Sequence, residues 1–230
     1  MIPIERAFAL TGVGSIRTYS HNKELVSERR EHIARSVAPL FVKKGYGHTS
    51  IREIAQTCGM SMGHLYYYIG GKEDVLQIMM DYDLHLYSDF IKQIVISFES
   101  LQPTEALVKT IDQFFRATDA ASDFTLFFYQ ETKSLHPDAR KIIMDRERGL
   151  VAEFEKLLRR GCYSGEFKID NIPLAANNIV ISGHMWALRR WLLRKTCSLD
   201  EYIRTQTDNI LKSISADGKM QPDKMLAKSK

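Results

Sequence analysis

The sequence predicts an all-α protein of about nine helices in two domains, and three observations support this fold class. Apolar residues recur every three or four positions along most of the 230 residues, which is the period of a helix with one buried face. No stretch alternates apolar and polar residues over the length of a strand. Glycine and proline stand between the periodic segments, where helices end and begin.

Composition narrows the class of protein. With 44% hydrophobic and 26% charged residues, the chain can bury a core larger than that of one small module. The net charge of +4 is compatible with a polyanionic partner but does not require one. Cys58, Cys162 and Cys197 are far apart, so we expect no disulfide, no metal site, no cofactor and a cytoplasmic location. No apolar run reaches the roughly 18 residues of a membrane span, and no membrane partner is expected.

The N-terminal part begins without a regular pattern. Residues 1–22 have no sustained period and are expected to form a mobile arm. A helical period begins at Lys23 and should end at Gly45. Pro39 lies inside this helix and predicts a kink between Arg35 and Pro39, because proline removes one amide donor.

The stretch 49–76 predicts two short helices joined by a tight turn, followed by the start of a third. Thr49 is the candidate N-cap of the first helix, which should end at Gly59, where glycine tolerates a left-handed backbone. Ser61 can cap a second helix over 62–69. A helix, a glycine turn and a second helix form the arrangement of many DNA-reading motifs.

The residue types of the second helix suit a groove of DNA. Leu65 is its predicted buried anchor. Four residues are predicted to face outward: Gly63, His64, Tyr67 and Tyr68. Lys72 stands at the first turn of the next helix, where free amides and the helix dipole already attract a phosphate.

The bounds of the remaining helices are predicted from the glycine, proline and capping residues that separate them. A helix over 72–98 would span about 40 Å at about 1.5 Å per residue, which is long enough to join two domains. Further helices are expected over 103–120, 124–135, 137–161, 172–194 and 198–215. Residues 216–230 are expected to form a disordered tail. The two domains would therefore occupy 23–76 and 77–215.

Five short motifs lie in order between Arg30 and Leu76: LFVKKGY, TSIREIA, CGMS, LYYYI and KEDVL. Together they resemble the N-terminal domain of the tetracycline-repressor (TetR) family of bacterial regulators. Ile69 departs from the family pattern, which usually has phenylalanine there, but it replaces one apolar core residue by another. The resemblance implies a ligand-responsive, sequence-specific DNA-binding regulator, in most cases a repressor that its effector releases from a pseudo-palindromic operator.

We expect two groups of DNA contacts on this segment. The residues expected near base edges are Met62, Gly63, His64 and Tyr67. Those expected to hold phosphates are Thr49, Ser50, Tyr68 and Lys72. Arg52 could reach either kind of group.

The segment 123–130, DFTLFFYQ, is apolar around more of its circumference than a surface helix should be. Ordinary core packing is one interpretation. The other is an effector pocket, which the resemblance favours because TetR-like proteins bind small effectors in their C-terminal domain. The candidate ligand-binding residues are Phe114, Phe115, Phe127, Phe128, Gln130, Asn178, His184 and Trp186.

The expected effector is a small apolar molecule, such as a fatty or aromatic acyl compound or its CoA thioester. Arg189, Arg190 and Arg194 could bind the phosphate of such a thioester, or could simply form an exposed basic face. The helix expected over 172–194 is apolar on two sides, and the helix expected over 198–215 has apolar residues at helical spacing that could pack with it. The resemblance implies that they pair with their symmetry mates in a homodimer.

Two other functional classes compete with this interpretation. The sequence contains no HExxH, phosphate-binding glycine loop or GxSxG motif, so we expect no enzyme and no catalytic residue. A helical protein-interaction module, or a ligand-binding protein without a role at DNA, stays an alternative. That alternative leaves Tyr67, Tyr68 and Lys72 unexplained.

Overall fold

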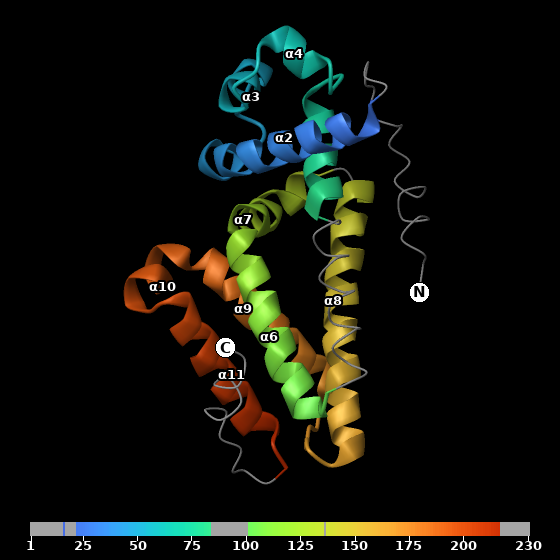
Figure 1. The fold of residues 1–230 in the computed structure, drawn as a ribbon, viewed down its shortest axis with the longest axis vertical. Coiled ribbons are helices and arrows are strands. Elements are labelled where there is room, and N and C mark those ends of the chain that lie inside the picture. Colours follow the sequence, from blue (N-terminus) through green and yellow to red (C-terminus); the bar gives the residue numbers. More distant parts are fainter. Residues whose placement is uncertain (1–15, 17–21, 84–100, 136, 217–230) are drawn as a thin grey trace. The chain divides into compact units, whose positions relative to one another are not determined.

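The computed structural model describes residues 16, 22–83, 101–135 and 137–216, and helices carry the labels of Figure 1. Within these residues the regular structure is helical, apart from an isolated antiparallel bridge between Phe167 and Ser215. The all-α fold class is therefore confirmed. None of the described helices is long and apolar enough to cross a bilayer.

The chain divides into two compact units. The first consists of Met1–Leu86 and Leu126–Arg146, and the second of Tyr87–Thr125 and Glu147–Lys230. Leu126–Arg146 thus packs with the N-terminal residues, a grouping that the continuous ranges expected from the sequence do not contain. The expected arm and tail lie almost wholly outside the described residues.

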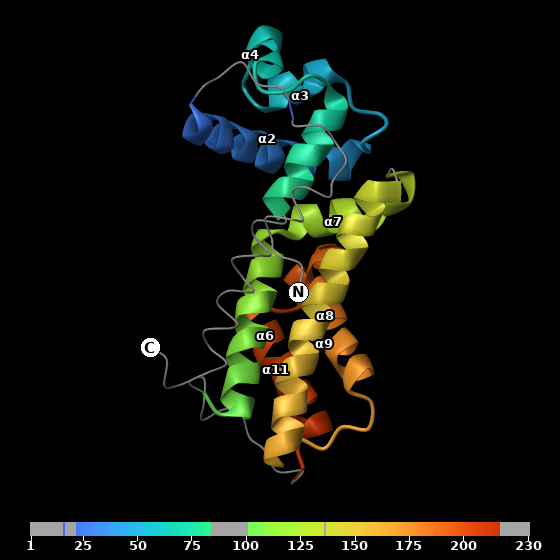
Figure 2. The same cartoon turned by 90° about the vertical axis from the view of Figure 1, so that its right-hand side faces the viewer.

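The first unit is built on α2 (Lys23–Lys44), against which α3 packs, and α4 packs in turn against α3 (Figure 2). Asn22 caps α2 by accepting a hydrogen bond from the Leu25 amide at 3.1 Å, and α2 ends at Gly45, whose φ is +86°. The helix is unbroken through the exposed Pro39. Its buried face consists of Val26, Ile33, Ala34, Val37, Ala38 and Phe41, the spacing that the sequence predicted.

A further helix of the first unit begins at residue 72 and is described to residue 83. Val75, Ile78 and Met79 bury its inner face. The expected continuation to residue 98 lies outside the described residues. Asp83 forms an ion pair with Arg146 of α8 (Pro137–Ser164), so this helix also contacts the second segment of the first unit.

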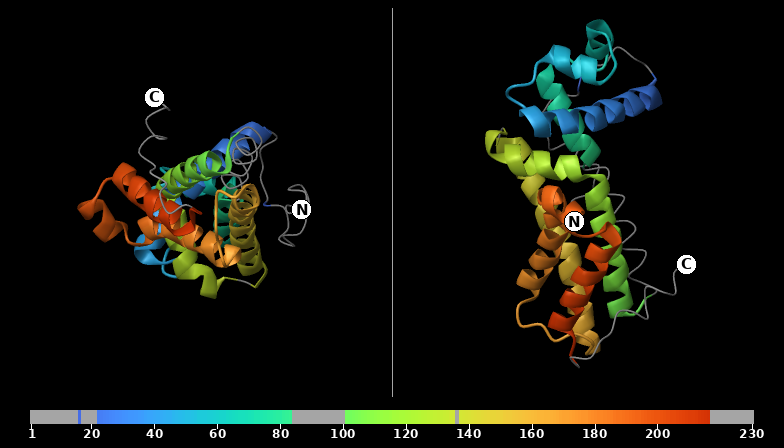
Figure 3. Two further views of the ribbon diagram at one scale, coloured as in Figure 1. Left: turned by 90° about the horizontal axis from the view of Figure 1, so that it is seen from below. Right: turned by 90° about the vertical axis from the view of Figure 1, so that its left-hand side faces the viewer.

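In the second unit, α6 runs alongside α9 and α11 (Figure 3). The helices of the C-terminal half are α6 (Pro103–Ala120), α7 (Ser122–Glu131), α8, α9 (Ile172–Leu188), α10 (Arg190–Thr196) and α11 (Leu199–Ile214). Of the sequence expectations, α6 has the predicted bounds. The helix expected over 172–194 is instead two helices, because the backbone leaves the helical conformation at Arg189. The helix expected to reach 135 ends in the 3₁₀ turn Thr132–Ser134.

Close packing of α6 against α9 depends on Gly183. A Cβ atom added at Gly183 would lie 2.4 Å from Cε1 of Phe114, far inside van der Waals contact. The core around this crossing is aromatic, since Phe115 and Phe154 are fully buried beside Phe114. Glycine at this position therefore sets the distance between the two helices.

Candidate DNA-binding surface and effector region

The helix α3 (Ile51–Thr57) begins at a capping box. The Ser50 hydroxyl accepts a hydrogen bond from the Glu53 amide at 3.3 Å, and the Glu53 carboxylate accepts one from the Ser50 amide at 2.8 Å. The prediction of Thr49 as the N-cap is wrong by one residue, because the reciprocal pair needs the glutamate three positions after the cap. Thr49 is instead buried, and its hydroxyl donates to the Gly45 carbonyl at 2.9 Å.

The turn after α3 has the predicted form. Gly59 has a φ of +65°, which glycine adopts without strain. Ser61 caps α4 (Met62–Tyr66) by accepting from the His64 amide at 3.1 Å. His32 of α2 lies 3.0 Å from the Cys58 carbonyl through its Nε2, which ties the turn to α2. The two helices are therefore joined and held as a helix-turn-helix.

The outward face of α4 differs from the predicted one. Gly63, His64 and Tyr67 are exposed as expected, but Tyr68 is only 3% exposed, so the prediction that it faces outward is wrong. The physical reason is that Tyr68 follows the buried Leu65 by three positions, so both side chains lie on the inner side, although α4 itself ends at Tyr66 rather than at Ile69.

Several contacts hold Tyr68 in this inward position. Its ring centroid lies 5.4 Å from that of His64 and 5.3 Å from that of Tyr67, and its carbonyl accepts from Arg30 at 3.4 Å. Tyr66, which the sequence reasoning missed, is 42% exposed. The helical period could have found it, because Gly63 and Tyr66 share a face while Leu65 and Tyr68 share the opposite one.

Lys72 is the first residue of its helix, as predicted, but its ammonium already has partners. Its Nζ donates a hydrogen bond to the Tyr46 carbonyl and lies 4.3 Å from the centroid of the Tyr46 ring. Asp74 accepts from the Gly70 amide at 2.6 Å and so ties the preceding loop to the first turn of the helix. The lysine is therefore held at the N-terminus of a helix, next to the loop that leads into α3.

Charge on this surface is arranged around Glu53. Lys44 pairs with Glu53, and the hydrogen bonds from Lys44 and from Ser50 lower the pKa of the Glu53 carboxyl to about 2. Arg52, the next residue along α3, is exposed. Lys44 is thus neutralised locally, whereas the side chain of Arg52 is open to solvent.

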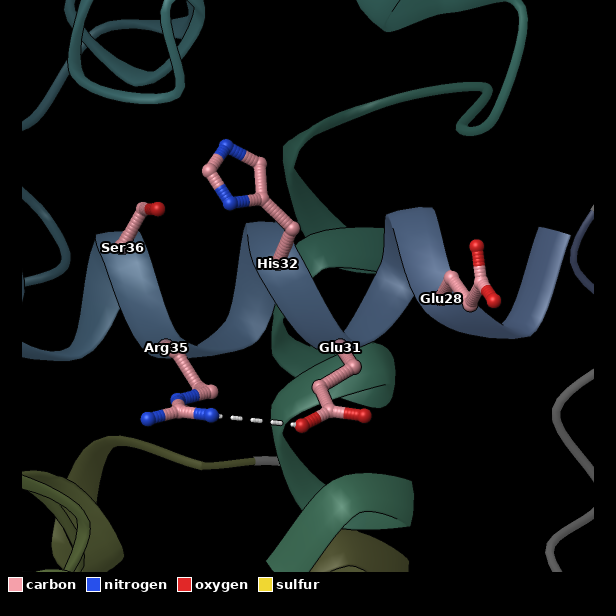
Figure 4. A pocket seen from close by; sticks show the side chains of 5 residues that line it. All are labelled: Glu28, Glu31, His32, Arg35 and Ser36. Atoms are coloured by element: carbon pink, nitrogen blue, oxygen red, sulfur yellow. Dashed lines mark hydrogen bonds and ion pairs between the residues drawn. The ribbon is translucent and has the colours of Figure 1, made fainter. Parts of the chain in front are cut away.

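A hollow of about 420 Å³ lies on α2 and is lined by Glu28, Glu31, His32, Arg35 and Ser36 (Figure 4). An ion pair of 3.4 Å joins Arg35 to Glu31 on the side of α2 away from the His32 ring. Because two of its five lining side chains are carboxylates, the hollow is a poor site for phosphate. We assign it no role in DNA binding.

Comparison with known proteins agrees with this geometry. The family description "Bacterial regulatory proteins, tetR family" matches residues 38–79, and "Tetracyclin repressor-like, C-terminal domain" matches residues 100–195. The HTH-type transcriptional regulator HbdR of Aromatoleum sp. (strain CIB) is 32% identical over 84% of this chain and 84% of its own. The chain belongs to the TetR family. It is accordingly a DNA-binding transcriptional regulator, with the helix-turn-helix described above as its DNA-reading element.

Solved TetR-family structures share the fold of this chain. The regulator PfmR from Thermus thermophilus is 28% identical, with a TM-score of 0.65, over 78% of this chain and 97% of its own. The regulator AibR, solved in complex with isovaleryl coenzyme A and operator DNA, has a TM-score of 0.66 at 22% identity, over 82% of this chain and 98% of its own.

The candidate effector residues of this TetR-family chain are divided between the two units. Phe127 and Phe128 belong to the first, where Phe127 is fully buried with its ring centroid 5.5 Å from that of Phe41. The second unit contains Phe114, Phe115, His184 and Trp186, all buried. Gln130 and Asn178, the two predicted amide anchors, are exposed on the described chain.

The polar groups of the second-unit cluster are bonded within the protein. His184 Nδ1 lies 3.8 Å from a carboxylate oxygen of Glu147, and the His184 ring centroid lies 5.7 Å from that of Phe114. The Trp186 indole donates to Asp119 at 2.6 Å. Beside Trp186, burial raises the pKa of the Tyr202 hydroxyl to about 12. This region of α6 and α9 is thus an aromatic core with a few buried polar contacts.

The arginines that were considered as an anion site are engaged elsewhere. Arg190 pairs with Asp123 at 2.6 Å, and Arg194 pairs with Asp119 at 2.8 Å. Arg189 lies over the ring of Trp191, 5.2 Å from its centroid. These contacts fasten α10 to α6 and to the start of α7, which neither sequence interpretation of the three arginines anticipated.

Proposed function

We propose that the protein is a homodimeric, cytoplasmic repressor that binds a pseudo-palindromic operator and is released by a small apolar effector. The observation that carries the proposal is the helix-turn-helix itself, with its exposed α4 face and with Lys72 at the start of the next helix. The proposal includes no enzymatic step. In this proposal, the effector regulates DNA binding because it binds one of two protein conformations more tightly than the other.

The exposed residues of α4 supply the proposed base contacts. We assign Met62, Gly63, His64 and Tyr67 to base edges, because they lie at the exposed or half-buried surface of α4. Ser50, Arg52, Tyr66 and Lys72 are assigned to phosphates. Thr49 and Tyr68 are buried, so their proposed part in phosphate binding is to support the backbone and side chains around them.

Dimerisation is proposed through α9 and α11. Leu174 and Ile181 of α9 are 54% and 39% exposed, seven residues apart and therefore on the same side of the helix. Both residues would be covered if α9 paired with its symmetry mate. Two recognition helices would then read half-sites separated by about 34 to 36 Å or more.

For the effector we propose an acyl compound, free or as its CoA thioester, bound in the C-terminal domain. The aromatic cluster of Phe114 and Trp186 supplies apolar surface, and AibR provides a structural relative whose complex contains an acyl-CoA. Each methylene that becomes buried contributes about 0.8 kcal/mol. A coupling of about 1 to 3 kcal/mol between effector and operator would change DNA affinity about 5- to 150-fold.

The proposal is tested in two steps on one preparation. Genomic fragments are first selected by gel shift against excess nonspecific competitor, and a fragment retained specifically is expected. Fatty, aromatic and CoA-linked acyl compounds are then titrated into the protein–operator complex, and release is expected with one class. Absence of any specifically bound fragment contradicts the regulator, whereas saturating ligand without a change in DNA affinity contradicts only the effector mechanism.

A further inference from the structure

Tyr46, in the loop between α2 and α3, bonds both to the end of α7 and to Lys72. The Tyr46 amide donates to the Glu131 carboxylate at 3.3 Å, and Glu131 is the last residue of α7. The Tyr46 carbonyl accepts from the Thr49 amide at 3.2 Å and from Lys72 Nζ, and the Tyr46 ring lies under the same ammonium. All these groups belong to the first compact unit.

The chain on either side of Tyr46 has unusual freedom. Gly45 and Gly47 flank it, and glycine has the widest choice of backbone conformations. Gly45 has a φ of +86°, and its backbone runs close to Glu131, since a Cβ added there would lie 3.6 Å from Oε1. Contacts with other parts of the chain therefore have to fix the conformation of residues 45–47.

Glu131 is not placed where an acidic residue helps its own helix. It stands at the C-terminal end of α7, where the negative end of the helix dipole disfavours a carboxylate, and α7 has no basic residue in its last turn. The adjoining apolar contact is tight, because Phe127 of α7 and Phe41 of α2 are both fully buried and their ring centroids lie 5.5 Å apart. The end of α7 is thus anchored on α2, which places the Glu131 carboxylate beside the Tyr46 amide.

We propose that Glu131 is a positioning residue for DNA binding, which fixes Tyr46 and through Tyr46 fixes the ammonium of Lys72 for a phosphate of the operator. The inference rests on the proposed function, in which Lys72 binds phosphate. Loss of the Glu131 acceptor leaves the Tyr46 amide without this partner. The segment is then held through the Gly45 and Tyr46 carbonyls, which accept from Thr49. The carbonyl and the ring that orient Lys72 are then less firmly placed.

Two neutral replacements of similar length isolate the acceptor. Glu131→Gln keeps an oxygen that can accept from the Tyr46 amide, whereas Glu131→Met keeps the length but supplies no comparable acceptor. Both remove the same charge, so their difference does not contain the general effect of charge on DNA affinity. Glu131→Asp is the third variant, because it keeps the charge but draws the carboxylate back by one methylene.

Operator affinity is measured by fluorescence anisotropy between 50 and 200 mM salt, after circular dichroism has established which variants are folded. The Gln variant is the reference for the Met variant, because both lack the charge, and the wild type is the reference for the Asp variant. Relative to these references, the Met and Asp variants are expected to lose about one phosphate contact, which lowers the salt slope by about 0.9. Between 50 and 200 mM salt, a fourfold range, the affinity of each should therefore fall about 3.5-fold less than that of its reference. In the Lys72→Ala background, the Gln and Met variants are expected to bind alike.

Several results would overturn the inference. Equal affinities and slopes for the Gln and Met variants would do so, and so would a Met effect that adds fully to that of Lys72→Ala. If the Glu131→Met variant does not fold, the Glu131→Asp variant alone tests the inference. The inference then requires that Glu131→Asp weaken operator binding and lower the salt slope. Wild-type protein without operator preference overturns the proposed function as well, whereas specific binding by the wild type with insensitive variants overturns only the role of Glu131.

Discussion

Replacing Gly183 by alanine tests the packing on which the second unit depends. The added Cβ would lie 2.4 Å from Phe114 Cε1, whereas carbon atoms in contact prefer about 3.5 to 4.0 Å. A shift of more than about 1 Å is therefore required. Phe114 cannot easily supply it, because the residue is only 5% exposed and its ring is bordered by the rings of Phe115, Phe154 and His184.

The expected magnitude combines two opposing effects. Overpacking a filled core costs about 1 to 3 kcal/mol. Alanine in place of glycine inside a helix returns about 1 kcal/mol. Gly183→Ala should therefore lower the free energy of unfolding by up to about 2 kcal/mol, rather than raise it as an unhindered alanine would.

Urea unfolding followed by tryptophan fluorescence is the appropriate assay. The chain has two tryptophans, Trp186 and Trp191, and both belong to the second unit, so the signal reports on the unit that is perturbed. The control is a double-mutant cycle with Phe114→Leu, in which the smaller side chain should relieve the clash. A coupling of about 1 to 3 kcal/mol is expected. A coupling near zero, or a Gly183→Ala variant more stable than the wild type by about 1 kcal/mol, would refute the reasoning.

Three further predictions concern the DNA surface, the dimer and acid stability. Lys72→Ala should weaken binding to all sequences alike and reduce the salt slope by about one, whereas His64→Ala should change the preference among operators; anisotropy with operator variants distinguishes them. Ile181→Asp should leave the monomer folded and shift sedimentation from dimer to monomer, because the side chain is exposed on one protomer but covered in the proposed pair. An unshifted dimer would remove α9 from the interface. The pKa of Glu53 is lowered from 4.5 to about 2, so its stabilising contribution is complete above pH 4.5 and is lost as the pH falls toward 2. Thermal unfolding of the wild type and of Glu53→Gln should therefore converge in acid, and a constant difference between about pH 5 and about pH 2 would contradict the lowered pKa of Glu53.

The sequence by itself determined the elements whose signals are local. Pro103 begins α6, and Gly59 and Ser61 define the turn and the start of α4, because these residues act through their own backbone angles and through amides three positions away. The same holds for the buried spacing of α2. The resemblance to the TetR family could be found from sequence because its five motifs lie close together, between Arg30 and Leu76.

Tertiary structure alone decided which distant segments support the functional surface. Arg30 reaches the Tyr68 carbonyl from 38 residues earlier, and Leu126–Arg146 joins the first unit because Phe127 packs on Phe41. The pairing of Glu131 with Tyr46 spans 85 residues. A helical period specifies which face of a segment is apolar, but the partner that covers the face is fixed only when distant segments pack together.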